Sequence, residues 1–150
     1  MPADNIAFSD DDAVLEFERN IEDTWPRLDE EGNVRRDWRV QRRLATREIE
    51  RYFGATRSSS EPFELGRIGL RTQKKLRDPE ACLTLHYIYI AADTQGDQSA
   101  FFARKAAHYY DVAMNMLGKI ALQMDYDADN SGTTDDNEAN QPMPMRFIRG

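Results

Sequence analysis

The residues best suited to chemistry lie near the C-terminus, in an acidic stretch that begins at Asp127 and ends at Glu138. Oxygen-bearing side chains fall at positions 1, 3, 5, 7, 9 and 12 of this twelve-residue stretch, and glycine falls at position 6. Helix–loop–helix calcium loops have this spacing, because Ca²⁺ binds several hard oxygen atoms and the chain turns sharply at the glycine. The sequence therefore offers one candidate Ca²⁺ site, whose ligands would be Asp127, Asp129, Ser131, Thr133, Asp135 and Glu138.

Other features of the same segment argue against a calcium site. Thr134 stands at position 8, where such loops usually place an aliphatic residue that pairs with a second loop, and the chain has no second loop. Pro142 and Pro144 limit any helix that follows, because proline cannot donate a backbone hydrogen bond. The alternative is an acidic linker that matches the pattern by composition. We therefore expect no cofactor, and Ca²⁺ binding remains a second hypothesis.

No other residues form a catalytic or metal-binding motif. Cys82 and His86 lie one helical turn apart, and with His108 they supply three residue types that bind zinc, but no CxxC or HExxH pattern accompanies them. Nucleophile motifs, phosphate-binding loops and dinucleotide-binding glycine patterns are also missing from the sequence. The carboxylates fall in acidic runs that are typical of solvated surfaces. We expect that the protein is not an enzyme.

Arginines are concentrated in a helix that the sequence predicts over Asp37–Phe53, where Arg39, Arg43, Arg47 and Arg51 repeat every four residues. Acidic protein surfaces and nucleic-acid phosphates both pair with such an array. The whole chain has a pI of about 4.9, whereas nucleic-acid-binding domains are usually basic. We therefore expect these arginines to contact a neighbouring subunit, without sequence-specific binding of nucleic acid.

Charge is strongly separated along the chain. Residues 1–34 carry a net charge of −9 and residues 35–77 carry +8, within a total of −7. Blocks of opposite sign favour head-to-tail contact between copies, but they also neutralise one another when they pack within one fold. The sequence leaves both interpretations open.

The C-terminal tail has the composition of a binding arm. After two prolines it combines large apolar side chains with arginine, and so short a segment cannot bury them by folding alone. A frayed terminus is the alternative. We expect the tail to dock onto a partner through Met143, Met145, Arg146, Phe147, Ile148 and Arg149.

Helical periodicity predicts the elements that position these groups. A helix capped by Ser9 would bury Val14, Phe17, Ile21, Trp25 and Leu28, and the second helix, ended by Gly54, would bury Val40, Leu44, Ile49, Tyr52 and Phe53. Residues 55–76 predict a loop-rich insertion, with a small hairpin around Phe63–Leu70.

The second half of the chain predicts two further helices. One would begin with Asp78 as its N-cap and Pro79 in its first turn, and it is apolar on most sides over Ala81–Ala92. The other, over Gln98–Met124, carries a regular apolar stripe: Phe102, Ala106, Tyr109, Ala113, Leu117, Ile120 and Met124.

These elements predict an all-α fold: a small helical bundle with a long C-terminal helix, a loop-rich middle segment and an extended C-terminal arm. Residues 1–124 would form the bundle, and residues 125–150 the acidic linker and arm. No apolar run approaches the roughly 20 residues that span a bilayer, so we expect no membrane partner. The acidic N-terminus and the single cysteine, Cys82, predict a cytosolic protein without disulfides.

The order of these parts resembles the head–tail adaptor (connector, or head-completion) proteins of tailed bacteriophages. The resemblance rests on the short first helix, the arginine-rich second helix and the loop-rich middle. It also rests on the segments Leu76–Glu80, His108–Tyr110 and Met145–Gly150. It covers most of the chain and depends on architecture, because that family has no strict motif.

The resemblance implies a structural virion protein. Such adaptors form a ring, typically of twelve copies, beneath the portal protein, and their C-terminal arms clasp the portal. They seal the DNA-filled head and present a docking surface to the stopper or tail protein. The expected location is therefore the head–tail interface of the virion, after synthesis in the cytoplasm of the bacterial host. A calcium-binding helical interaction module and a small regulatory protein that binds a nucleic-acid enzyme are the alternatives.

Overall fold

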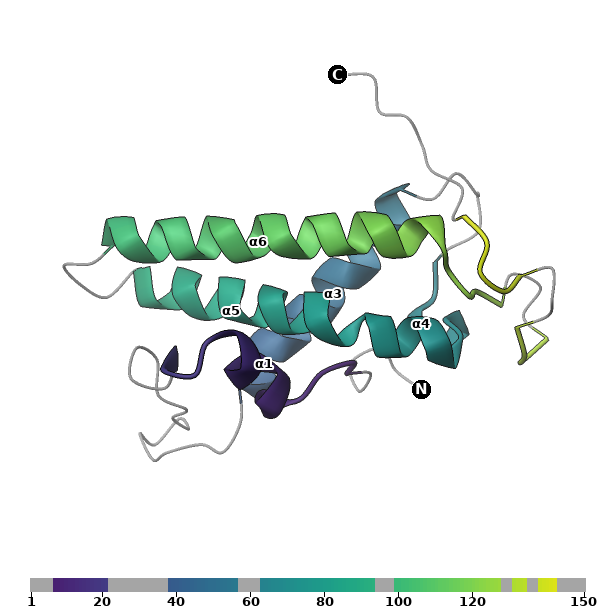
Figure 1. Cartoon of the computed structure of the whole chain (residues 1–150), viewed down its shortest axis with the longest axis horizontal. Coiled ribbons are helices and arrows are strands. Elements are labelled where there is room, and N and C mark those ends of the chain that lie inside the picture. Colours follow the sequence, from purple (N-terminus) through teal and green to yellow (C-terminus); the bar gives the residue numbers. More distant parts are fainter. Residues whose placement is uncertain are drawn as a thin grey trace, which may run out of the picture.

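The computed structural model describes six stretches of the chain and confirms an all-α fold for them (Figure 1). The described stretches are residues 7–21, 38–56, 63–93, 99–127, 131–134 and 138–142. Their helices are α1 (Asp11–Phe17), α3 (Arg39–Thr56), the 3₁₀ helix η2 (Leu65–Arg67), α4 (Leu70–Lys75), α5 (Arg77–Asp93) and α6 (Ser99–Leu122).

Helix α5 is the centre of the bundle, as its sequence predicts. Six consecutive residues, Glu80–Leu85, are fully buried, so every face of this stretch of helix is enclosed. Helix α6 runs antiparallel beside α5, α3 crosses behind the pair, and α1 lies across the remaining side (Figure 1). The near-continuous apolar sequence of α5 requires this arrangement, because each exposed face would leave apolar surface in water.

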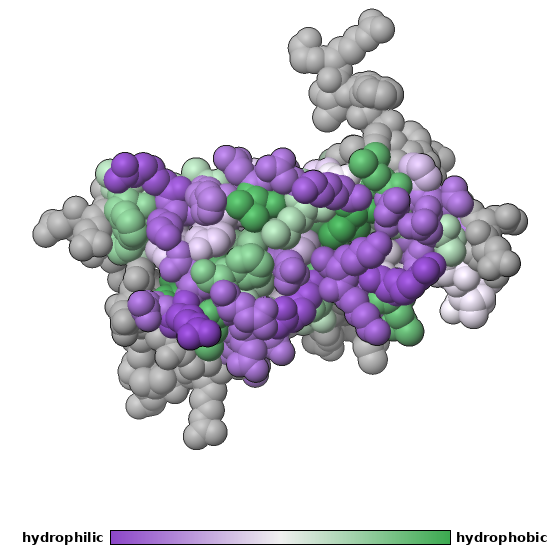
Figure 2. Space-filling view, in the orientation of Figure 1, coloured by the Kyte–Doolittle hydropathy of each residue, from purple (hydrophilic) through white to green (hydrophobic). Residues whose placement is uncertain are grey.

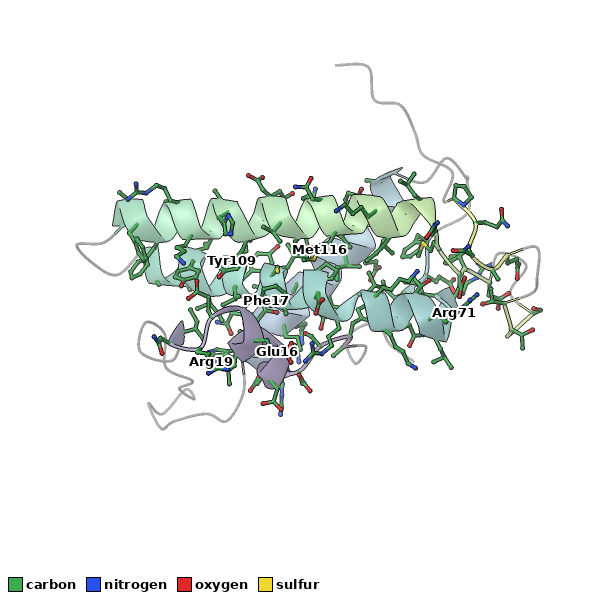
Figure 3. The ribbon with its side chains drawn as sticks, viewed as in Figure 1. Glu16, Phe17, Arg19, Arg71, Tyr109 and Met116 are labelled. Carbon is green, nitrogen blue, oxygen red and sulfur yellow. The ribbon has the colours of Figure 1, made fainter. Side chains whose placement is uncertain are left out.

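The long helix α6 confirms the predicted stripe. The structure buries six of its seven members and leaves Phe102 half-buried. On the side that faces the viewer, Phe17 of α1 and Met116 of α6 are half-buried and pack against the core that contains Tyr109 (Figure 3). Apolar atoms show there through a surface that is otherwise mostly hydrophilic on this side of the molecule (Figure 2).

The start of α1 differs from the expectation. Asp10 is the N-cap, and its carboxylate accepts a hydrogen bond from the amide of Ala13 at 2.9 Å. Ser9 instead donates its hydroxyl to the carboxylate of Glu80, at 2.7 Å. The prediction failed because a buried carboxylate 71 residues away is a stronger acceptor for that hydroxyl than anything nearby in the sequence.

Helix α1 is also shorter than expected, because it ends at Phe17 and is followed by Glu18 in an extended conformation. Val14 and Ile21 are buried as predicted, and Phe17 is half-buried. The other two predicted members of this stripe, Trp25 and Leu28, lie outside the described residues.

Helix α3 continues through Gly54 to Thr56, so the predicted stop at glycine is wrong. Its buried face includes Ile49 and Phe53, but Val40 and Leu44 are exposed. Their places in the core are taken by the other apolar side chains at this end of the helix, Trp38 and Ala45.

The predicted N-cap at Asp78 is wrong as well. Helix α4 leads almost directly into α5, and only Leu76 separates them, in a right-handed helical conformation. Helix α5 begins at Arg77, so Pro79 lies within its first turn, where the missing N–H of proline is tolerated. The predicted hairpin around Phe63–Leu70 is also wrong, because this segment holds η2 and the start of α4.

Glu80 ties the N-terminal segment to the bundle. Its carboxylate accepts hydrogen bonds from the amides of Phe8 and Ser9, at 3.0 and 2.9 Å, and from the hydroxyls of Ser9 and Thr46, at 2.7 and 3.0 Å. None of these donors is charged. Burial raises the pKa of Glu80, and the hydrogen bonds from Ser9, Phe8 and Thr46 offset only part of that rise.

We predict that Glu80 makes stability depend on pH. Above the ordinary pKa of 4.5, the folded chain retains a proton at Glu80 that the unfolded chain has lost. Stability contributed by this residue therefore falls as pH rises from 4.5 through the raised folded-state pKa. The Glu80→Gln variant lacks this titration. Denaturant unfolding should show the stability of the native chain falling relative to that of this variant as pH rises, with exposed Glu64→Gln as the control for loss of one carboxylate.

Candidate functional site

The most elaborate polar site lies at the far end of the bundle, where the chain leaves α6. Asp125 is its centre. The carboxylate accepts hydrogen bonds from Nε of Arg71 at 2.9 Å and from the amide of Asn140 at 2.5 Å. Its amide donates to Oγ1 of Thr72 at 2.8 Å, and its carbonyl accepts from the amide of Gly69 at 2.8 Å. One residue thereby joins α4, the end of α6 and the C-terminal segment.

Two residues further along, Asp127 and Arg67 are joined by two hydrogen bonds. The amide of Asp127 donates to the carbonyl of Arg67 at 2.8 Å, and Nε of Arg67 donates to the carbonyl of Asp127 at 2.7 Å. The guanidinium of Arg67 also lies 5.3 Å from the ring centre of Tyr126, which stacks on the ring of Phe63. These contacts fix residues 124–127 against η2.

The first half of the predicted calcium loop forms a tight turn. Asp127 accepts hydrogen bonds from the amides of Ser131 and Gly132, at 3.0 and 2.8 Å. Gly132 has a φ of 93°, a conformation that favours glycine, as the pattern requires at position 6. Ser131 donates its hydroxyl to the carbonyl of Thr133 at 3.0 Å.

The surroundings of this turn differ from those of a helix–loop–helix site. Helix α6 ends at Leu122, and the chain then pairs through isolated bridges, Met124 with Gln141 and Ile68 with Tyr126. Among the described residues, no three acidic, histidine or cysteine side chains are placed to hold a metal. Asp129 and Asp135 lie outside the described residues, while Glu138 lies in a turn. Calcium binding therefore stays a prediction.

A cleft of about 520 Å³ opens between these segments. Its walls are Gly66–Arg71, Asp125 and Asp127, Gly132–Thr134, and Ala139. Arg71 lines it, at the end of the molecule where α6 ends (Figure 3). The opposite charges on its walls are paired with each other or with backbone amides, so the cleft has no strong preference for an anion or a cation.

Histidine and cysteine side chains do not assemble into a zinc site. Cys82 is fully buried in the core, and burial raises the pKa of its thiol to about 12. His86 uses Nδ1 for a 2.7 Å contact with the carbonyl of Ala106, whereas His108 is exposed on α6. The structure therefore gives these residues separate, structural surroundings.

Acidic residues of the first helix pair with basic residues of the same chain. Asp11 forms an ion pair with Arg42 of α3, and Glu16 pairs with Arg77 at 2.8 Å. This pairing supports the interpretation that the charge blocks partly neutralise each other within one fold.

Glu18 extends this pattern to α6. It accepts hydrogen bonds from Lys105 and Tyr109, both at 2.6 Å. Burial opposes the ionisation of Glu18, but the bonds from Lys105 and Tyr109 hold its pKa below the ordinary value. The end of α1 is thereby fixed to the middle of α6.

The arginines of α3 divide into two groups. Arg51 is held by Glu48, with its Nε 2.9 Å from a carboxylate oxygen, so its charge is balanced within the helix. Arg39, Arg43 and Arg47 are exposed on the outer side of α3. The structure therefore keeps three of the four predicted arginines together on one exposed surface.

The predicted binding arm lies outside the described residues. This applies to all its proposed contact residues: Met143, Met145, Arg146, Phe147, Ile148 and Arg149. Its starting point is described. Met124 and Gln141 exchange two backbone hydrogen bonds, of 2.9 and 3.1 Å, and Pro142 follows directly. The arm therefore begins beside the C-terminal end of α6.

Sequence reasoning missed the residues that organise both ends of the bundle, Glu80, Glu18 and Asp125. A carboxylate inside an apolar helix is a signal for Glu80, because such a group must find hydrogen-bond donors. Glu18 and Asp125 have no comparable local signal, since their cationic partners, Lys105 and Arg71, are 54 or more residues away.

No described helix has the length and apolar character that crossing a membrane would require. No protein-family model, curated protein or solved structure matches this chain.

We predict that Gly69→Ala destabilises the far end of the bundle. A Cβ at this position would lie 2.7 Å from Cβ of Asp125, and neither atom is at the end of a flexible side chain. The expected loss of unfolding free energy is about 1–3 kcal/mol, measured by chemical denaturation. Gly66→Ala is the matched control, because a Cβ there meets nothing within 4 Å. Equal stability of the two variants would contradict the packing described.

We also predict that any Ca²⁺ binding depends on Asp127. Calorimetric titration with Ca²⁺ should release or absorb heat in the native chain and not in Asp127→Asn, whose amide cannot supply the full charge. Exposed Asp12→Asn serves as the control for loss of one negative charge. A native chain that shows no heat at millimolar Ca²⁺ would eliminate the site.

Proposed function

We propose that this protein is a head–tail adaptor of a tailed bacteriophage, a structural virion protein without catalytic activity. Copies would form a ring, of twelve in the usual arrangement, beneath the portal protein and would link the DNA-filled head to the stopper or tail protein. The protein would be made in the host cytoplasm and would act at the head–tail interface of the virion.

One observation carries this proposal: the arginine- and methionine-rich arm begins at a fixed point on a rigid bundle. The Met124–Gln141 pair and the Asp125 hydrogen bonds hold the chain up to Gln141. Everything after Pro142 therefore starts from a defined position beside α6. A rigid bundle with an apolar and basic arm suits a subunit that binds a neighbour through that arm, because less of the binding energy is lost in ordering the bundle.

The order of elements in the described part supports the same function. A short α1, an arginine-rich α3, a buried α5 and a long α6 follow one another as in the family that the sequence resembles. The portal would receive the arm through Met143, Met145, Phe147 and Ile148 as apolar anchors, with Arg146 and Arg149 pairing acidic groups.

A calcium-responsive interaction module is a second candidate. The turn at Gly132, where two amides bond to the carboxylate of Asp127, is the observation that favours it. Under this candidate, the cation would order the segment after Asp127, and partner binding would require millimolar Ca²⁺.

We predict that deleting residues 143–150 abolishes binding to the portal protein encoded in the same genome and leaves helicity unchanged. The arm carries the proposed anchors, whereas the described contacts of the bundle end at Gln141 and Pro142. Co-purification of the two proteins measures binding, and circular dichroism measures helicity.

Two narrower variants sharpen this test. Phe147→Ser with Ile148→Ser should weaken portal binding at least tenfold, while Leu122→Ser, an exposed apolar residue on α6, should leave it unchanged. Undiminished portal binding by the truncated chain would refute the adaptor assignment, and binding that requires Ca²⁺ would favour the second candidate.

A further inference from the structure

The outer side of α3 presents aliphatic and basic side chains together. We define the α3 face as Arg39, Val40, Arg43, Leu44 and Arg47. All five are exposed, Val40 by 51% and Leu44 by 38% of their surfaces. At 100° per residue they occupy one side of the helix, opposite the buried Ile49 and Phe53. The face is therefore a continuous surface rather than a scatter of single residues.

The packing of α3 explains why this face is left outside. Trp38 and Ala45 fill the space at the start of the helix, so Val40 and Leu44 turn away from the core. Arg43 makes no hydrogen bond or ion pair with another described residue. Arg51, by contrast, is paired with Glu48 and does not belong to the face.

The composition of the α3 face favours protein over nucleic acid as its partner. Phosphate groups would pair with the arginines but would leave Val40 and Leu44 without apolar contact. Arginine beside apolar side chains is the composition enriched in protein interfaces. A matching partner carries several carboxylates with apolar side chains among them.

The chain itself carries a segment with this composition. Residues 1–34 hold 11 acidic side chains against two arginines, interspersed with Phe8, Phe17, Trp25 and Leu28. Asp11, Glu16 and Glu18 are engaged with basic residues of the same chain, and Asp10 caps α1. The block carries a net charge of −9, so its ion pairs with Arg42, Arg77 and Lys105 leave it negative overall.

We propose that the α3 face binds the acidic N-terminal block, residues 1–34, of a second copy of this chain. A positive surface on one copy and a negative one on the next form a head-to-tail contact, the kind that closes into a ring. The inference rests on the proposed ring-forming function and names the contact that would build the ring.

Zero-length crosslinking between labelled and unlabelled chains tests this contact. The Arg43→Lys variant introduces an amine on the α3 face, and a carbodiimide joins it only to a carboxylate that it touches. Chains carrying this substitution are prepared with ¹⁴N and with ¹⁵N, mixed at low salt, crosslinked and digested. We expect mass spectrometry to find position 43 of one isotope joined to an acidic residue of block 1–34 of the other. Arg104→Lys, an exposed arginine on α6, is the matched control and should give no such product.

Self-association provides the second measurement. Sedimentation equilibrium should show association that weakens at least tenfold in 0.5 M salt, because exposed ion pairs are screened there. Arg43→Glu with Leu44→Ser should weaken it at least tenfold at low salt, and Arg104→Glu should not. Circular dichroism verifies that the variants remain helical.

Each contrary result overturns the inference in a recognisable way. Crosslinks confined to one isotope show that the block folds onto its own chain, and the absence of crosslinks removes the contact. Binding of a DNA duplex that the Arg43→Glu, Leu44→Ser variant loses would assign the face to phosphate instead. The portal co-purification test is separate, since the arm and the α3 face are altered by different substitutions. Portal binding without the crosslink refutes this contact alone.

Discussion

A single buried carboxylate, that of Glu80, joins the segment before α1 and helix α3 to helix α5. Glu80 lies in the first turn of α5, where it receives hydrogen bonds from the segment before α1 and from Thr46 of α3. Removing a carboxylate from water is costly, and the fold offsets that cost with neutral donors rather than with a cation. The donors come from two separate parts of the chain, and Glu80 from a third, so these hydrogen bonds form together only when α1, α3 and α5 are packed in this arrangement.

That arrangement solves the problem posed by α5. A helix that is apolar on all sides needs cover on all sides, and α6 and α3 leave one side open. The seven-residue α1 closes it with Ala13 and Val14, both fully buried. So short a helix is not stable alone, which is why polar contacts fasten it at several points. Glu80 holds the segment before it, Arg42 holds its first residue, Arg77 holds Glu16 in its last turn, and Lys105 holds Glu18 just after its end.

At the opposite end, backbone contacts replace buried apolar surface. Gly69 lets α4 approach Asp125 closely, and Asp125 in turn fixes the segment that returns past the end of α6. This end is polar, holds a cleft and is the origin of the C-terminal arm. The two ends of the molecule thus differ in chemistry, and the α3 face lies along a side of its own. A subunit that contacts several neighbours at once has need of such separate surfaces.

The sequence by itself determined the helices whose signal is local. The apolar stripe of α6, the apolar character of α5 and the arginine repeat of α3 follow from helical spacing, and the structure places them as the spacing predicts. Gly132, at the sixth position of the calcium-loop pattern, likewise predicted the turn in which it lies. Each of these depends only on residues within a few positions of one another, so periodicity and turn chemistry suffice to identify them.

Tertiary structure alone decided which competing partner each residue takes. Ser9 bonds Glu80 instead of capping α1, Trp38 is buried whereas Val40 is exposed, and Pro79 lies in the first turn of a helix that begins two residues earlier, at Arg77. Sequence patterns distinguish only weakly between Asp10 and Ser9 as the N-cap of α1, or between Val40 and Trp38 as the core residue. The deciding contacts are made with groups that are distant in the chain. Burial and long-range hydrogen bonding settle such choices together, and their free energies exceed the small differences in local preference.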